Sequence, residues 1–192
     1  EVIGTFGLSL SDLSTKITKL ILATLGLDAE TFYESDFEKC KPTLCISGYS
    51  SHGKCEGEEA LPSHADAGCV TILYNDETQG LEVRSKQGKW FSVEHAPDSF
   101  AVMLGDSLKA WSNGRYRSAD HRVVYKGWKN RISFPFLIEF PPETRVWAPE
   151  ELVDEDNPRR YKPFIVSEFV NRLLDNQADD EFPKAIERFA GI

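Results

Sequence analysis

The chain has 192 residues, a formal net charge of −9 and a sequence pI of about 5.0. This length is enough for one domain with a sizeable buried core. The acidic balance argues against nucleic acid or an anionic membrane as a main partner, because both attract basic surfaces. The sequence shows no signal peptide and no apolar run near the roughly 20 residues of a membrane-spanning helix.

The cysteine pattern bears on the compartment of the protein. Cys40, Cys45, Cys55 and Cys69 form no Cys-x-x-Cys pair and no disulfide-dense pattern. Reduced thiols are typical of cytosolic proteins, so we expect free thiols and a cytoplasmic location. The chain begins at Glu1 rather than Met, which is compatible with a fragment or a processed form of a longer chain.

Residues 10–25 are predicted to form the first helix. Ser9 and Asp12 have the spacing of a capping box at its start, and Gly26 is a natural end. We expect this helix to serve packing and to carry no chemistry. Its apolar residues recur at three- and four-residue steps and form one stripe: Leu10, Leu13, Ile17, Leu20 and Ile21.

Short strands separated by turn signals are predicted between about residues 43 and 140. Gly80, Gly88, Gly105-Asp106 and Asn113-Gly114 are among these turn signals, and many short strands at this spacing favour a sandwich or a jelly roll. The expected strands cover residues 44–49, 69–74, 81–84, 90–93, 100–104, 121–125 and 131–140.

Helices are predicted again at the end of the chain. A proline-rich, acidic connection follows residue 140, and the apolar spacing within residues 167–176 indicates a helix. A second short helix is expected to start at Pro183, because proline suits a first helical turn. The expected fold class is therefore mainly β, with a jelly-roll core and flanking α-helices.

A His and an Asp stand two residues apart in the run "LPSHADAG", at His64 and Asp66. Residues i and i+2 of a strand face the same way, so both side chains could point to one metal ion. His121 opens an expected strand and offers a third ligand, because distant strands become neighbours in a jelly roll. His52 and His95 lie in loop-like stretches and are expected at the surface.

Two metals suit this set of ligands. Two His and one carboxylate are typical of non-haem Fe(II) with open positions, and the same ligands could hold Zn(II) with water as the fourth ligand. Iron would leave room for a 2-oxo acid and dioxygen, and the far carboxylate of the oxo acid would then need a cation. Arg131 and Ser133 share one face of an expected strand, one hairpin after His121, and a guanidinium binds a carboxylate through two hydrogen bonds.

These residues resemble the H-x-D…H…R-x-S set of the plant-type 2-oxoglutarate- and Fe(II)-dependent dioxygenases. The resemblance runs from about residue 10 to residue 169. It includes the segments "TQGLEVRSKQGKW", "FAVMLGDSLKAWSNGRYRSADHRVV" and "PEELVDEDNPRRYKPF". The "GLEV" and "LVDEDNPRRYKPF" segments resemble the glucosinolate-side-chain and auxin-oxidising branches more than the flavonoid branch.

The resemblance implies a double-stranded β-helix, or jelly roll, with iron at one mouth. It implies that Fe(II) is held by His64, Asp66 and His121, and that the cosubstrate 2-oxoglutarate is held by Arg131, Ser133 and Tyr49. Ser47 stands where many relatives have Asn in an R-x-N-x-Y motif, so that contact differs here. Ascorbate is expected as a further cofactor, dioxygen and a small-molecule substrate as partners, and a monomer as the assembly.

Two function classes remain open. The leading hypothesis treats residues 1–192 as one dioxygenase domain that hydroxylates or desaturates a small organic metabolite of plant secondary metabolism, with release of succinate and CO2. Relatives carry a further segment before the first helix, and its absence here supports the alternative: a truncated, non-catalytic module that binds metal and 2-oxoglutarate. A zinc hydrolase, the third option, would explain neither Arg131 and Ser133 nor the wider resemblance.

Overall fold

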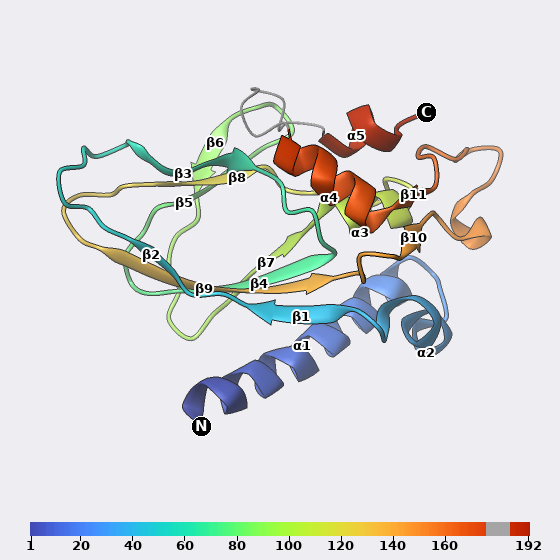
Figure 1. Ribbon diagram of the computed structural model, residues 1–192, viewed down its shortest axis with the longest axis horizontal. Helices are drawn as coiled ribbons and strands as arrows, with labels where there is room; N and C mark the ends of the chain where they lie inside the picture. The colour runs from blue at the N-terminus through green and yellow to red at the C-terminus, as the bar shows by residue number, and fades with distance from the viewer. Residues whose placement is uncertain (176–184) are drawn as a thin grey trace.

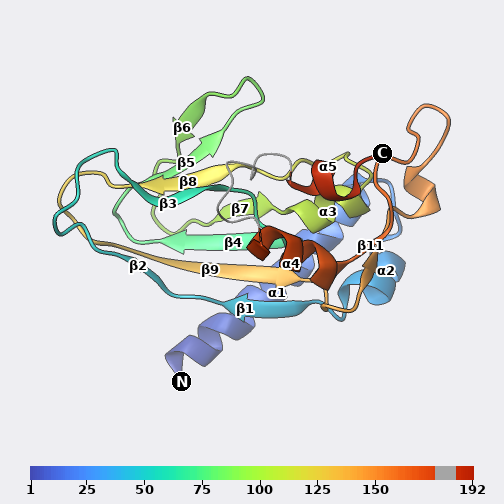
Figure 2. The same cartoon turned by 45° about the horizontal axis from the view of Figure 1, so that its top comes forward.

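Two antiparallel β-sheets face each other, with helices outside them (Figure 1, Figure 2). The computed structural model describes residues 1–175 and 185–192. Its larger sheet has the strand order β1-β9-β4-β7, with β2 also paired to β9, and its smaller sheet has the order β3-β8-β5-β6. The strands are β1 (Lys41–Leu44), β2 (Ser47–Tyr49), β3 (Glu59–His64), β4 (Val70–Asn75), β5 (Leu81–Arg84), β6 (Trp90–Ser92), β7 (Ala101–Leu104), β8 (His121–Val124) and β9 (Arg131–Glu139), with a separate pair β10 (Arg145–Val146) and β11 (Phe164–Ile165).

The helices gather outside the sheets and at one end of them (Figure 1). The mainly β fold with flanking helices is confirmed, and β4 to β9 lie within one residue of the predicted strand bounds. No helix among residues 1–175 and 185–192 is both long and apolar enough to cross a membrane. The helices are α1 (Val2–Thr24), α2 (Ala29–Phe32), the π-helical turn η1 (Tyr33–Phe37), α3 (Asp106–Trp111), the 3-10 turn η2 (Glu150–Leu152), α4 (Val166–Asp175) and α5 (Ala185–Ala190).

Helix α1 starts earlier than the sequence predicts. The capping-box prediction is wrong, because the Ser9 hydroxyl lies inside the helix and donates to the Thr5 carbonyl at 3.1 Å. Phe6 packs against the same core as Leu10, so the apolar stripe begins one turn before residue 10. The apolar face of α1 thus covers the larger sheet on the side away from the smaller sheet (Figure 2).

The predicted end of α1 at Gly26 is confirmed. Gly26 has φ +77°, a conformation that glycine adopts without strain. The Gly26 N–H donates to Ala23 at 3.0 Å and the Leu27 N–H donates to Leu22 at 3.2 Å. These are the two bonds of a Schellman motif, which satisfies carbonyls left over at a helix end.

The strand predicted over residues 44–49 is split into β1 and β2. The Cys45 N–H donates to the Pro135 carbonyl at 2.9 Å, but Pro135 has no N–H with which to return the bond. The ladder therefore breaks opposite a proline in the central strand β9. All four cysteines are free thiols, as expected.

Two elements near the sequence motifs are missing from the predicted helices and strands. Strand β3 was assumed only for His64 and Asp66 and given no bounds, because Pro62 and register shifts against β8 disturb its alternation. The Gly105-Asp106 pair was read as a turn, yet Gly105 is the N-cap of α3. Helix α4 follows its prediction to within one residue, whereas the helix start expected at Pro183 lies outside the described residues.

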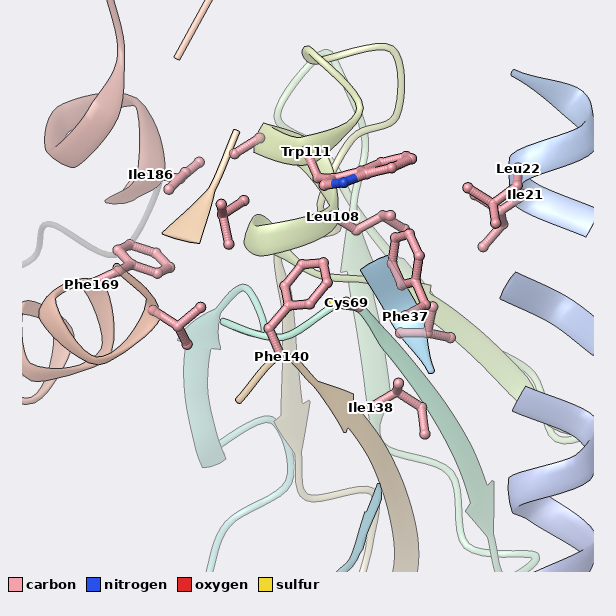
Figure 3. Packing of buried hydrophobic residues seen from close by; sticks show 14 of the residues in the cluster. Ile21, Leu22, Phe37, Cys69, Leu108, Trp111, Ile138, Phe140, Phe169 and Ile186 are labelled. Carbon is pink, nitrogen blue, oxygen red and sulfur yellow. The ribbon is translucent and has the colours of Figure 1, made fainter. Parts of the chain in front are cut away.

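The main core holds α3 in place at the end of the larger sheet (Figure 3). Leu108 and Trp111 of α3 are buried, and the Trp111 ring packs edge-on against Phe37 at 4.9 Å between centroids. The Trp111 indole N–H also donates to the Asp36 carboxylate at 2.7 Å. Because α3 is anchored on both its apolar and polar sides, its first residues can serve as a fixed support for the neighbouring loops.

Candidate metal centre

Three ligating side chains converge between the two sheets. His64 ends β3 and His121 begins β8, and the two residues are direct partners in the register. The Nε2 atom of each histidine lies 3.8 Å from Oδ1 of Asp66. One ligand atom from each residue lies within 4.8 Å of the others, a spacing that a single metal ion can bridge.

Asp66 reaches this position from a loop and not from a strand. The predicted geometry, with His64 and Asp66 on one strand face, is therefore wrong, although the predicted convergence is observed. Strand β3 ends at His64, and the chain turns before Asp66. His52 is exposed and His95 is partly exposed, and neither belongs to the group of ligands.

Hydrogen bonds on the far side of each ligand fix its chemical form. Nδ1 of His64 lies 2.8 Å from the Pro62 carbonyl, and Nδ1 of His121 lies 3.0 Å from the Ala119 carbonyl. A carbonyl only accepts, so each Nδ1 carries the proton and each Nε2 keeps a free lone pair. Burial, followed by the charge of His121, lowers the pKa of His64, which favours the neutral ligating form.

The Asp66 carboxylate is also oriented by a partner. The Thr71 hydroxyl donates to its Oδ2 at 2.5 Å, and Oδ1 is left facing the two histidines. Thr71 lies on β4 and is buried, so the bond is shielded from water. The carboxylate therefore presents one oxygen to the metal position.

Backbone contacts from the start of α3 hold the loop that carries Asp66. The Asp106 N–H donates to the Asp66 carbonyl at 2.8 Å, and the Gly105 N–H donates to the Cys69 carbonyl at 3.0 Å. Gly105 approaches so closely that a Cβ there would lie 2.3 Å from the Gly68 oxygen and 2.7 Å from the Asp66 oxygen. A side chain at position 105 would thus push the ligand loop away from α3.

Arg131 and Ser133 are brought together at the start of β9. Arg131 is 3 % exposed, and its Nη1 donates to the Ser133 hydroxyl at 3.1 Å. Its Nη2 donates to Oδ1 of Asn75 at 2.6 Å, and its guanidinium lies 5.2 Å from the centre of the Tyr49 ring. Asn75 was not predicted; it joins the site because it is the register partner of Ser133, which one sequence does not reveal.

The Arg131 guanidinium is a buried cation that is short of partners. Burial lowers its pKa, and Tyr49 and Asp76 oppose that shift in part, while a guanidinium stays charged in proteins. Its Nε is buried without a hydrogen-bond partner, and among the described residues no carboxylate forms an ion pair with it. An unpaired buried charge is costly, so this position fits an anionic ligand.

A cavity lies at the other end of the inner face of β9. Arg131, Ser133, Pro135, Leu137 and Glu139 follow one another on that face, and Leu137 is the partner of the Asp66-bonded Thr71. The metal position therefore lies between the Arg131 end and the Glu139 end. A cavity of about 390 Å³ occupies the Glu139 end, and its walls include Lys41, Ala67, Glu139, Val166 and Val170.

Comparisons with known proteins agree with this fold and geometry. Residues 40–140 match the family model described as the 2OG-Fe(II) oxygenase superfamily. The chain belongs to this superfamily, and the predicted family and jelly-roll fold class are confirmed. The metal in the name of this family is Fe(II), so membership in the family does not favour the Zn(II) alternative.

The particular relatives are plant dioxygenases. The chain is 32 % identical to a probable 2-oxoglutarate-dependent dioxygenase AOP1.2 of Arabidopsis thaliana, over 100 % of this chain and 60 % of the relative. It is 37 % identical to the 2-oxoglutarate-dependent dioxygenase AOP3 of the same plant, over 77 % of this chain and 37 % of the relative. The solved structure of the rice dioxygenase for auxin oxidation has a TM-score of 0.86 at 29 % identity, over 98 % of this chain and 62 % of that one. The matched part of the chain thus spans between 37 % and 62 % of the length of these relatives.

Proposed function

We propose that residues 1–192 form the metal- and cosubstrate-binding domain of an oxygenase that uses Fe(II) and 2-oxoglutarate. The reaction proposed is hydroxylation or desaturation of a small organic metabolite, with release of succinate and CO2. The observation that carries the proposal is the unpaired, buried guanidinium of Arg131 on the inner face of β9, between the same two sheets as the convergent His-Asp-His group. A hydrolytic zinc site would give that cation no role.

The metal ligands in this proposal are Nε2 of His64, Nε2 of His121 and Oδ1 of Asp66. Two histidines and one carboxylate suit Fe(II) and leave positions for other ligands. The chain prepares them, because carbonyls hold both Nδ1 protons and Thr71 holds the second carboxylate oxygen. When bound, Fe(II) with 2-oxoglutarate supplies an oxidant made from dioxygen, strong enough to attack a C–H bond.

The cosubstrate clamp in this proposal is Arg131 with Ser133. A guanidinium and a hydroxyl can both donate to the far carboxylate of 2-oxoglutarate. Asn75 keeps the guanidinium in place, and Tyr49 covers it from the neighbouring strand β2. The clamp thus binds and orients the cosubstrate without moving a proton.

The substrate in this proposal occupies the cavity at the Glu139 end, across the metal position from Arg131. Its walls are largely apolar, with Lys41 and Glu139 as the charged residues, so a small and mostly apolar molecule fits. Two similar proteins are described together with small molecules. One is the rice dioxygenase for auxin oxidation, and the other is JOX2, whose structure was solved in complex with 2OG, Fe and JA.

A second candidate is a non-catalytic module that binds the metal and 2-oxoglutarate. It concerns residues 1–192 by themselves, which span about 60 % of the relatives' length, so any substrate walls contributed by other residues lie outside this sequence. In either case we propose a cytoplasmic monomer that acts in plant secondary metabolism, with ascorbate as a further cofactor of the catalytic form.

The test is anaerobic titration of the chain with Fe(II) and then 2-oxoglutarate, followed by exposure to air with candidate substrates. We expect one Fe(II) per chain and a visible charge-transfer band only when both are present. Succinate matched one-to-one by oxidised product would support the enzyme. Binding of Fe(II) and 2-oxoglutarate with no succinate formed would support the non-catalytic module. No metal bound by the unaltered chain would overturn the proposal.

A further inference from the structure

Helix α3 touches both of the chain segments that supply metal ligands. On one side, the Asp106 N–H donates to the Asp66 carbonyl at 2.8 Å. The next residue, Ser107, donates to the Ala67 carbonyl through its N–H at 3.1 Å and through its hydroxyl at 2.5 Å. The backbone of the Asp66 loop is therefore fixed to the first turn of α3.

On the other side, the Asp106 carboxylate accepts a hydrogen bond from the Ser118 hydroxyl. Ser118 precedes Ala119, whose carbonyl accepts the Nδ1 proton of His121 at 3.0 Å. Asp106 is 3 % exposed and Ser118 is 8 % exposed, so water does not compete strongly for this bond. One residue thus links the backbone of the Asp66 loop with the segment that orients His121.

An ordinary helix-capping role does not account for this burial. The N-cap of α3 is Gly105, and a first-turn acid favours the helix dipole from a solvent-exposed position as well. A buried carboxylate is unfavourable unless its contacts compensate. The Asp106 side chain faces Ser118 and a polar cavity of about 320 Å³ that is separate from the ligating atoms, so it is not itself a ligand.

We propose that Asp106 is a positioning residue that sets the separation of Asp66 and His121, with Ser118 as its partner. The inference rests on the proposed metal site. Asp106 holds Asp66 through the main chain and His121 through Ser118 and Ala119. If either link is lost, one ligand segment moves relative to the other and the three ligating atoms no longer match one ion.

The experiment measures Co(II) affinity and the visible Co(II) spectrum of the metal-free chain and its variants. Asp106→Ala and Ser118→Ala should each weaken Co(II) binding by about 10–100-fold, the range found for residues that orient ligands. The Co(II) bands should shift, because the ligand geometry changes. Asp106→Asn keeps an acceptor for Ser118 and should stay close to the unaltered chain. In the double variant the losses should not add, because both single changes break the same bond.

The matched control is Ser112→Ala at the C-cap of the same helix. Ser112 is fully buried; its hydroxyl donates to the Lys109 carbonyl at 3.1 Å and accepts from the Tyr116 N–H at 3.3 Å, and neither bond reaches the Asp66 loop or Ser118. This variant should lower the melting temperature and leave Co(II) affinity unchanged. If Ser118→Ala behaves in the same way, Asp106 is only structural and the inference is wrong. If the unaltered chain binds Co(II) no better than His64→Ala, the metal site itself fails and the inference falls with it.

Discussion

The two ends of β9 differ in how far the chain has prepared them for a ligand. At the Arg131 end the guanidinium is buried, and Ser133, Asn75 and Tyr49 surround it in fixed positions. At the Glu139 end a half-buried carboxylate borders a cavity, and among the described residues no hydrogen bond or ion pair satisfies it. The Lys41 side chain on the neighbouring strand is exposed.

This difference indicates which kind of ligand suits each end: a cosubstrate of fixed chemistry at the Arg131 end and a more specific ligand at the Glu139 end. A preorganised end suits a ligand of fixed chemistry such as 2-oxoglutarate, because little ordering remains to be done on binding. An end whose polar side chains are unpaired forms its remaining hydrogen bonds and ion pairs with the ligand that binds there. In the proposed function, substrate specificity depends on the Glu139 end, and the reaction class depends on the Arg131 end and the metal.

The largest expected effect is loss of the metal that both ends share. His64→Ala should abolish succinate formation. It should also weaken Fe(II) binding by more than the roughly 10–100-fold that is typical of substitutions in residues that orient a metal ligand. Metal analysis and a succinate assay check this. His52→Ala is the matched control, because that histidine is exposed and outside the ligand group. Full activity of the His64 variant, without added imidazole, would contradict the assignment.

The next effect should be confined to the Arg131 end. Arg131→Ala should weaken 2-oxoglutarate binding by about ten- to more than a hundredfold, because a charge-assisted bond contributes roughly 1.5–3 kcal/mol. Iron should stay bound. Arg131→Lys should restore binding only in part, since an ammonium cannot reproduce the two-pronged contact. Calorimetry that shows equal affinity in all three chains would remove Arg131 from the clamp.

A smaller effect is expected at the metal itself. Thr71→Val removes the hydroxyl that donates to Asp66 Oδ2 and should weaken Fe(II) binding by about tenfold, the lower end for a residue that orients a ligand. Thr71→Ser keeps the hydroxyl and should retain the affinity. A valine variant with unchanged affinity would show that the Asp66 carboxylate needs no such support.

The smallest effect on metal and cosubstrate is expected from Glu139→Gln. Both affinities should stay unchanged while the ranking of candidate substrates shifts, and Glu143→Gln, an exposed site, is the control for the lost charge. A shift of equal size in the control would mean that Glu139 does not contact substrate.

The same variant gives a prediction on pH. Burial, followed by the charge of Asp66, raises the pKa of Glu139 above its ordinary 4.5, so folding favours the protonated form. The stability that protonation gives is complete below the unfolded-state pKa and is lost as pH rises through the folded-state pKa. In the metal-free chain, Glu139→Gln should therefore unfold at higher denaturant than the unaltered chain at neutral pH, and this advantage should disappear in acid.

Much of the site could be predicted because it follows strand periodicity. Arg131 and Ser133 alternate on β9 as expected, and His121 opens β8 as expected. Asp66 was placed by a wrong argument, since contacts from α3 and not a strand bring it to the histidines. Asn75 could not be predicted, because its role depends on the register between β4 and β9.

The parts of the fold that were predicted wrongly share a physical reason. The split between β1 and β2 depends on Pro135, which is distant in sequence and removes one bond from the ladder. Helix α3 is short, and its core contacts through Leu108 and Trp111 stabilise it more than local propensity does. Local patterns describe a segment alone, whereas these features are decided by its neighbours.

The close approach of Gly105 to the Asp66 loop limits how this protein can change by mutation. Any other side chain at position 105 would meet backbone oxygens, which have no flexible end to move aside. Ala65 differs, because it borders the open 320 Å³ cavity and has room to grow. A library that randomised both positions and retained metal binders should return glycine at 105 and many residues at 65. Ala65, which lies between two proposed metal ligands, would then be freer to vary than Gly105, which is not itself a proposed ligand.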